Sequence, residues 1–100
     1  MAIDAIALHT TDNVATAVQD LKVGQEATVR INHDIHHIIL QEDIPYGHKF
    51  TLKPVYFGDK ILKYGEIIGR ATKDIGIGYH AHVQNIESLR GRGDLKVKED

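Results

Sequence analysis

The sequence predicts a mostly-β domain of short strands with little or no helix. Two observations support this prediction. The apolar runs are short, contain many β-branched residues and are interrupted by glycines. A pattern in which an Asp and an aliphatic residue precede a Gly recurs along the chain, as expected of sharp corners between strands. At 100 residues, 42% of them hydrophobic, the chain is long enough for one domain with one modest core.

The composition excludes several classes of function. The chain has no cysteines, so disulfides, thiolate metal sites and thiol catalysis are ruled out. No apolar run approaches the about 20 residues of a membrane-spanning helix, and the N-terminus lacks a basic segment followed by an apolar one. A formal charge of −2 gives no basic surface for nucleic acid, so we expect a cytoplasmic protein that binds neither membranes nor nucleic acid. The seven histidines are the unusual feature, because histidine titrates near neutral pH and binds metals.

The N-terminal segment predicts two strands. Residues 1–8 alternate loosely between apolar and polar and suit a first strand. Residues 10–13 predict a turn, because Asp12 and Asn13 can hydrogen-bond their own backbone. Residues 14–19 fit both a helical stripe and a strand. We favour the strand, because the flanking turns leave too few residues for a stable helix.

Two hairpins are predicted further along. Residues 27–40 contain two apolar stretches around a turn at residues 32–34. Residues 58–75, around which we expect the chain to be organised, contain two β-branched runs separated by Gly65, which supplies the positive φ of a tight turn. Gly69 permits a bulge or the close approach of another backbone. The polar residues expected to gather at one end of this hairpin are Lys63, Tyr64, Glu66 and Arg70.

A corner pattern recurs in four places. Residues 20–24, 43–47 and 74–78 each contain Asp, an aliphatic residue, two spacers and Gly, followed by alternating apolar residues. Residues 54–58 form a degraded copy that begins with Pro54. We expect the Asp to start each turn, the aliphatic residue to fill the core and the Gly to adopt the left-handed conformation, although Asp and Gly are common in turns generally. The uneven spacing indicates a corner reused within one domain, not a solenoid.

Four motifs occur in an order that resembles a known family. They are Asp12-Asn13-Val14-Ala15, Ile44-Pro45-Tyr46-Gly47-His48-Lys49, Lys63-Tyr64-Gly65-Glu66-Ile67-Ile68-Gly69 and His80-Ala81-His82-Val83-Gln84-Asn85. Together they resemble the N-terminal SAF-type domain, or separate small subunit, of altronate and galactarate dehydratases. The resemblance extends from about Ile6 to Leu95 and implies a small β-clip barrel of about eight short strands.

The chain departs from the family pattern in two places. The last motif often carries a third histidine where this chain has Gln84, which weakens any three-histidine metal site. The hairpin around residues 32–37 is longer and richer in histidine than expected. The composition of residues 90–100 predicts a linker or frayed tail after a domain of residues 1–89, and residues 90–95 resemble the junction into the large catalytic domain of fused members. The chain is therefore either a natural small subunit or a fragment cut at that junction.

The resemblance implies β-elimination of water from a sugar acid such as altronate or galactarate. Such a reaction needs a base, a stabiliser for the developing enediolate and an acid for the departing hydroxyl. The resemblance also implies a divalent metal, iron or manganese, in the complete enzyme, and a large catalytic subunit or domain as partner. We expect this small chain to help form the active site and to be inactive alone.

Three histidines are the expected catalytic residues. His80 and His82 are two positions apart, so on a strand they project from the same face, where they suit two metal ligands, an acid and a base, or merely an exposed surface. His48 follows Gly47, where the backbone can approach a ligand, although it also fits a surface position at a turn. We expect all three rings to meet at a common rim that a larger protein completes.

The expected substrate-binding residues are Lys49, Lys63, Tyr64 and Arg70. The cations can bind a substrate carboxylate, Arg70 in a bidentate manner, or can be solvated. Tyr64 can donate a hydrogen bond to substrate or pack across the hairpin. Of the remaining histidines, His36 and His37 would point to opposite faces of a strand, which favours a polar hairpin surface together with His33. His9 is expected to be structural or solvated.

Two other functions stay open. The small subunit of sulfolactate sulfo-lyase shares the same motifs, and sulfite would then be the leaving group. Alternatively, the fold serves as a stand-alone SAF-type carbohydrate-binding module without lyase chemistry. Exposed strand edges on a small β domain also favour self-association, so a homo-oligomer is a further expectation.

Overall fold

The computed structural model describes residues 2–89, which form an all-β domain without a helix. The strands are β1 (Ala5–Ala7), β2 (Val14–Ala17), β3 (Glu26–Ile31), β4 (Asp34–Ile39), β5 (Lys49–Thr51), β6 (Lys60–Lys63), β7 (Glu66–Ala71), β8 (His80–Ala81) and β9 (Ile86–Ser88). The predicted fold class is confirmed, and the ambiguous segment after residue 13 is a strand. Over residues 2–89, no helix could cross a membrane. The predicted linker, residues 90–100, lies outside the described residues.

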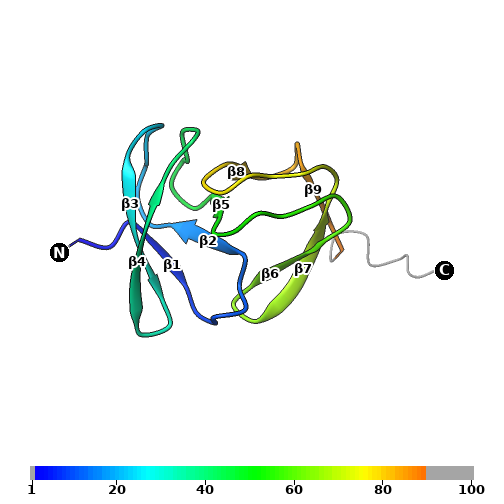
Figure 1. Ribbon diagram of the computed structural model, residues 1–100, viewed down its shortest axis with the longest axis horizontal. Helices are drawn as coiled ribbons and strands as arrows, with labels where there is room; N and C mark the ends of the chain where they lie inside the picture. Colours follow the sequence, from blue (N-terminus) through cyan, green and yellow to red (C-terminus); the bar gives the residue numbers. More distant parts are fainter. Residues whose placement is uncertain (1, 90–100) are drawn as a thin grey trace.

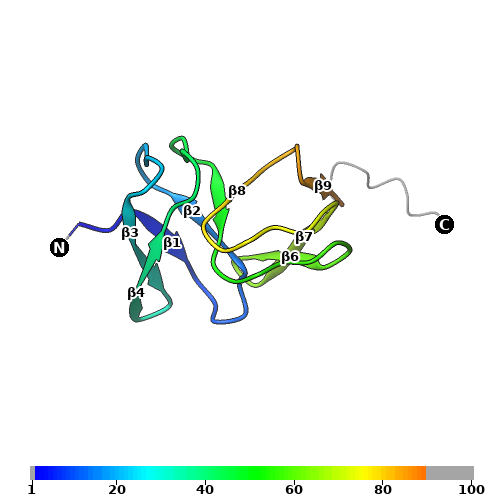
Figure 2. The same ribbon diagram turned by 45° about the horizontal axis from the view of Figure 1, so that its top comes forward.

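The strands form two sheets. The larger sheet has the order β4-β3-β1-β2-β5-β8, in which only β1 and β3 run parallel, and the smaller sheet has the order β6-β7-β9 (Figure 1). The β3–β4 hairpin lies at one end of the domain and the smaller sheet at the other, with β5 and β8 between them, as the turned view also shows (Figure 2). The edge strand β8 of the larger sheet therefore lies next to the smaller sheet.

The domain contains two hydrophobic clusters. The first cluster includes Leu21, Leu40, Ile44 and Phe50, and the second includes Val14, Val55, Ile61, Ile75 and Ala81. The chain thus buries two small clusters where the composition suggested one modest core. Neighbouring residues of β2 belong to different clusters, and so do the paired strands β5 and β8. These three strands join the two halves of the domain.

The turn before β2 connects distant segments. Asp12 Oδ2 accepts hydrogen bonds from the amides of Leu8 and His9, both at 3.1 Å, which confirms the local turn. The Asn13 side chain imitates a strand partner, because its Nδ2 donates to the Lys60 carbonyl and its Oδ1 accepts from the Leu62 amide, both at 2.8 Å. This short segment consequently attaches the β6–β7 hairpin to the larger sheet.

The β6–β7 hairpin turns at Tyr64 and Gly65, whose φ values of 54° and 80° confirm the predicted tight turn. Ile61 pairs with Gly69 but Leu62 pairs with Ile67, so one extra residue of β7 forms a bulge beside Gly69. The backbone of β9 also approaches Gly69 closely, since a Cβ there would lie 2.6 Å from the carbonyl oxygen of Glu87. Both expectations for Gly69 are confirmed.

The expected gathering of polar residues at one end of this hairpin is wrong for Arg70. Lys63 pairs with Glu66 next to the turn, whereas Arg70 pairs with Lys60 at the opposite end. The guanidinium of Arg70 forms an ion pair with Glu87 on β9. Four residues of β7 separate Arg70 from the turn with which the sequence pattern grouped it, because β7 is longer than the apolar run suggested.

The four corners pack in pairs. Leu21 bridges to Ile44, and Val55 bridges to Ile75, so the four aliphatic residues are buried as predicted. The last glycine of every corner has a φ between 83° and 87°. The predicted role of the aspartates is wrong, however, because each of them accepts a hydrogen bond from the partner corner instead of from its own turn.

In the first pair these bonds are reciprocal. Asp20 accepts from the Tyr46 amide at 2.8 Å, and Asp43 accepts from the Val23 amide at 2.9 Å. In the second pair, Asp74 accepts from the Phe57 amide at 2.8 Å, but the fourth corner begins with Pro54, which has no carboxylate to return the bond. The degraded copy therefore lacks one of the two cross-corner bonds.

Candidate functional site

The pairing of β5 with β8 brings the three predicted histidines together. Lys49 pairs with Ala81 and Phe50 pairs with His80, so His48 lies opposite His82. His48 Nδ1 and His80 Nε2 are 2.9 Å apart, and the ring centroids of His48 and His82 are 4.4 Å apart with the rings stacked. The prediction that these imidazoles meet at a common rim is confirmed.

Buried neighbours fix the backbone of this histidine cluster (His48, His80 and His82). Phe50 and Ala81 are fully buried, in different hydrophobic clusters, and their side chains hold the two strand segments in register. The three imidazoles themselves are only half-buried. The buried side chains of Phe50 and Ala81 thus hold the backbone of the cluster in place, while its rings remain accessible to a ligand.

A tight turn at residues 82–85 adds further support that the sequence interpretation missed. The buried Asn85 donates from Nδ2 to the His80 carbonyl and accepts at Oδ1 from the His82 amide, both at 2.9 Å. The Gln84 carboxamide nitrogen lies 3.1 Å from His80 Nδ1. An Asn three residues after His82 is a recognisable signal, because Asn side chains commonly bond the backbone of their own turn.

The surroundings of His80 and His82 favour the neutral form of these two imidazoles. Burial lowers the pKa of His80, and the neighbouring His48 and His82 lower it further against the opposing effect of Glu42. Glu42 also accepts a hydrogen bond from the His80 amide at 2.9 Å. Burial, His48 and Lys49 likewise lower the pKa of His82. Neutral imidazole is the form that ligates metals.

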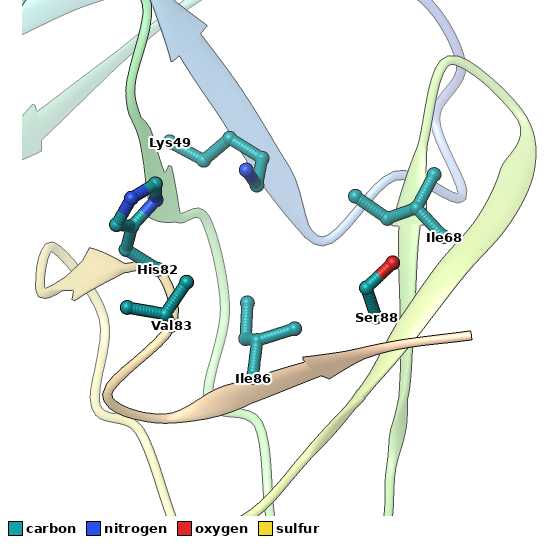
Figure 3. A pocket seen from close by; sticks show the side chains of 6 residues that line it. All are labelled: Lys49, Ile68, His82, Val83, Ile86 and Ser88. Carbon is teal, nitrogen blue, oxygen red and sulfur yellow. The ribbon is translucent and has the colours of Figure 1, made fainter. Parts of the chain in front are cut away.

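A pocket of about 210 Å³ adjoins the cluster (Figure 3). Its lining residues are Lys49, Ile68, His82, Val83, Ile86 and Ser88. The Lys49 side chain extends over the space between His82 and Ile68 (Figure 3). Burial and repulsion from Lys63 lower the pKa of Lys49, so its ammonium gains by pairing with an anion. A pocket with one cation, one imidazole and aliphatic walls suits a small organic acid.

The other three residues predicted to bind substrate differ in their distance from this pocket. Lys63 acts electrostatically on Lys49, and its Nζ lies 5.2 Å from the ring centroid of Tyr64. The Tyr64 amide is bonded to Asp12 within the turn. Arg70 is paired with Glu87 and lines a different pocket. Substrate binding by these residues stays a prediction.

Among residues 2–89, the histidine cluster is the one group of three or more His, Asp or Glu side chains whose ligand atoms converge. Each ring offers a nitrogen, and these nitrogens lie within 4.8 Å of one another. His36 and His37 are exposed on β4, as the predicted polar surface requires. His9 packs its ring against Gly65, where a Cβ would lie 2.8 Å from it, which fits the expected structural role.

The fold and the site define a small all-β module that carries three imidazoles and a lysine ammonium at one accessible face. The chain belongs to the altronate/galactarate dehydratase SAF domain family, whose match covers residues 3–89. The module is 41% identical to altronate dehydratase of Escherichia coli over 80% of this chain, and 40% identical to galactarate dehydratase of the same organism over 73%. It is also 29% identical to (2R)-sulfolactate sulfo-lyase subunit alpha of Chromohalobacter salexigens over 90% of this chain.

These relatives differ greatly in length. The chain spans 15% of the altronate dehydratase and 13% of the galactarate dehydratase. In contrast, it spans 99% of the sulfo-lyase subunit. The same module therefore occurs both as a small part of a long lyase and as a separate small subunit.

Proposed function

We propose that this chain is the small subunit or N-terminal domain of a sugar-acid dehydratase of the altronate or galactarate type. Its contribution is the imidazole–lysine face, which consists of His48, His80, His82 and Lys49. The observation that carries the proposal is the convergence of these groups beside a pocket of about 210 Å³. The chain forms one wall of the active site, and a large catalytic subunit or domain completes it.

The relatives support a partner of this kind. The dehydratases that match are several times longer than this chain, and the sulfo-lyase relative is designated subunit alpha, which implies at least one further subunit. The described residues supply cationic and imidazole groups, and the carboxylate that acts on His80 is that of Glu42, which already accepts a hydrogen bond from the His80 amide. A general base and acid placed by a partner would complete the requirements of the reaction.

In the proposed reaction, the proton on the carbon next to the carboxylate is removed and the hydroxyl on the following carbon leaves as water. The resulting enol takes up a proton on the carbon that lost the hydroxyl and gives up the proton of its enol oxygen, which yields a 2-keto-3-deoxy acid. Lys49 binds and orients the substrate carboxylate, while Ile68, Val83 and Ile86 exclude water from the carbon chain. A divalent metal, iron or manganese, would stabilise the negative charge that develops on the enediolate.

A second candidate is the small subunit of a sulfo-lyase. The match over nearly the full length of the sulfolactate sulfo-lyase subunit favours it specifically. The same carbon next to the carboxylate would lose its proton, but the carbon–sulfur bond would break and sulfite would leave. The imidazole–lysine face would have the same role in both reactions, since both develop charge on the substrate carboxylate.

Reconstitution with the partner tests the proposal. The chain is co-expressed with the large dehydratase-like subunit that co-purifies with it from the native cell, and the complex is given altronate, galactarate or sulfolactate. We expect 2-keto-3-deoxy acid from a sugar acid, no turnover by the chain alone, and loss of activity in Lys49→Met but not in the exposed control Lys53→Met. Sulfite release would select the second candidate. Turnover by the unaided chain, or the absence of any large partner, would contradict the proposal.

A further inference from the structure

We propose that His48, His80 and His82 bind one divalent first-row transition metal ion on this chain alone. The inference assigns the histidine cluster to metal ligation instead of proton transfer. The role of that ion in catalysis rests on the proposed function, but its binding depends only on the geometry of the described residues.

The spacing of the ring nitrogens fits a shared ion. Two imidazole nitrogens that bind one metal at about 2.0–2.1 Å lie about 3.0–3.4 Å apart. His48 Nδ1 and His80 Nε2 are already 2.9 Å apart, so they need to separate by only a few tenths of an ångström. The third nitrogen, on His82, lies within 4.8 Å of both, and its ring is stacked on that of His48. Small side-chain rotations are sufficient to bring it to the same ion.

Some ring nitrogens of the cluster have no hydrogen-bond partner among the described residues. One N–H of the His48–His80 pair lies between the two rings, and among residues 2–89 no hydrogen bond reaches the ring nitrogens of His82. Apart from the His48–His80 hydrogen bond, the rings meet only by stacking or at a tilt, and the Lys49 ammonium acts on them as a neighbouring charge. A cation that accepts three lone pairs turns this arrangement into an attractive one.

The surrounding structure holds the ligands in place before an ion arrives. The β5–β8 pairing fixes His48 against His82, and Asn85 clamps the backbone of the other two histidines. The Gln84 carboxamide at His80 Nδ1 directs the opposite nitrogen, Nε2, toward the cluster. Histidine ligands in metal sites commonly have such an outer hydrogen-bond partner, which orients the ring. Rotation of the carboxamide lets its oxygen accept from Nδ1–H when Nε2 ligates.

The site keeps room for a substrate. Three nitrogen ligands leave coordination positions open, as catalytic metal sites do. His82 lines both the cluster and the pocket that contains Lys49. An anionic hydroxy acid in that pocket would therefore lie between a fixed ammonium and the ion.

The experiment uses the full 100-residue chain without a polyhistidine tag. Co²⁺ is titrated anaerobically and its visible absorption bands are recorded, and Zn²⁺ affinity is measured by competition with a chromophoric chelator. We expect one ion per chain and nitrogen-type cobalt bands. Ring-proton NMR signals of His48, His80 and His82 are expected to shift, while those of His36 and His37 stay unchanged.

Substitutions locate the site. His48→Gln, His80→Gln and His82→Gln should each weaken binding by more than the about 10–100-fold typical of losing an outer partner. Gln84→Ala, at an exposed position, should weaken binding by about 10-fold and serves as a readout if a histidine variant does not fold. His36→Gln and His37→Gln are matched controls and should leave the affinity unchanged.

Two results would overturn the inference: the absence of cobalt bands in the folded chain, or an equal loss of affinity in the β4 controls. The outcome is separable from that of the proposed function. Lyase activity in the reconstituted complex without metal binding by this chain would remove the inference and leave the function. Metal binding by this chain without any lyase activity in the complex would support the inference and contradict the proposed function.

Discussion

Replacing Asp12 with Asn tests how the two halves of the domain are joined. The Asp12 carboxylate is almost completely buried. It accepts four backbone hydrogen bonds, from the amides of Leu8 and His9 at 3.1 Å, Tyr64 at 2.9 Å and Gly65 at 2.8 Å. The first two lie in its own turn and the last two lie in the β6–β7 turn, so one side chain connects both.

The magnitude follows from these four bonds. An Asn side chain of the same shape can keep its oxygen toward the three amides at Oδ2, but its NH₂ group would then face the Gly65 amide, donor against donor. Loss of that bond leaves a buried donor unsatisfied, at about 1–3 kcal/mol, and the three remaining bonds lose their charge assistance. We expect Asp12→Asn to lower the free energy of unfolding by about 3 kcal/mol. For a domain of this size that corresponds to a fall in Tm of roughly 12–24 °C.

The pH dependence gives an independent check of the same carboxylate. Burial alone would raise the pKa of Asp12, but the amides of Gly65, His9, Leu8 and Tyr64 outweigh it and hold the pKa below its usual value. The stabilisation is therefore fully present above the unfolded-state pKa and is lost as the pH falls through the lower, folded-state pKa. The wild-type chain should lose stability on acidification more steeply than Asp12→Asn.

Urea denaturation at several pH values measures both effects. Asp43→Asn is the matched control, because Asp43 is exposed and accepts one cross-corner bond, and it should cost no more than about 1 kcal/mol. If Asp12→Asn costs as little as the control, or if the two chains show parallel acid profiles, the carboxylate does not join the two halves as described.

Three further predictions concern the site and its support. Gly78→Ala should lower the free energy of unfolding by about 3–5 kcal/mol, because a Cβ at Gly78 would lie 2.3 Å from the Ile39 carbonyl oxygen. Gly24→Ala is the control and should cost about 1–2 kcal/mol, since Gly24 has nearly the same φ but open space around it. Equal losses of the two variants in urea denaturation would contradict this prediction. Asn85→Ala should lower the free energy of unfolding by about 1–3 kcal/mol, because it leaves the His82 amide without its acceptor. It should also shift the NMR signals of the His80 and His82 rings. Unchanged ring signals would argue against a positioning role for Asn85. Lys49→Met should raise Tm, by removing a desolvated cation, while abolishing the binding of a small hydroxy acid followed by NMR titration. A lower Tm, or retained acid binding, would oppose this view of the pocket.

Much of the fold could be predicted because its signals are local. The β-branched runs marked the hairpins, and the buried aliphatic residue and left-handed glycine of each corner followed from the pattern alone. The pairing of corners could not be predicted, because Asp20 bonds to an amide 26 residues away and no local pattern records that distance. The position of Arg70 was wrong for a related reason: a bulge and a long β7 place it where cross-strand pairing with β9, and not the turn, sets its surroundings.

The site was predictable in outline but not in its construction. The two-residue spacing of His80 and His82 indicated a common face, and His48 joined them in the structure. β8 contains only two residues, too few for a periodic signal, so the register that brings His48 opposite His82 depends on the burial of Phe50 and Ala81. Such a register is a tertiary property. The position of Asn85 indicated a side-chain bond within its own turn, but its role as a clamp was missed because the sequence does not show that this turn supports the histidine cluster.

The histidine cluster joins segments that are 32 residues apart in the chain. In an unfolded chain, these rings are separated by a large flexible loop, so a ligand that requires all of them recognises only the completed fold. At about 100 times its Kd, such a ligand would stabilise the native state by about 2.7 kcal/mol through mass action alone. If that ligand is the proposed metal ion, its binding to the three histidines would also protect the folded module against proteolysis, and the supply of the ion would then affect the amount of intact protein.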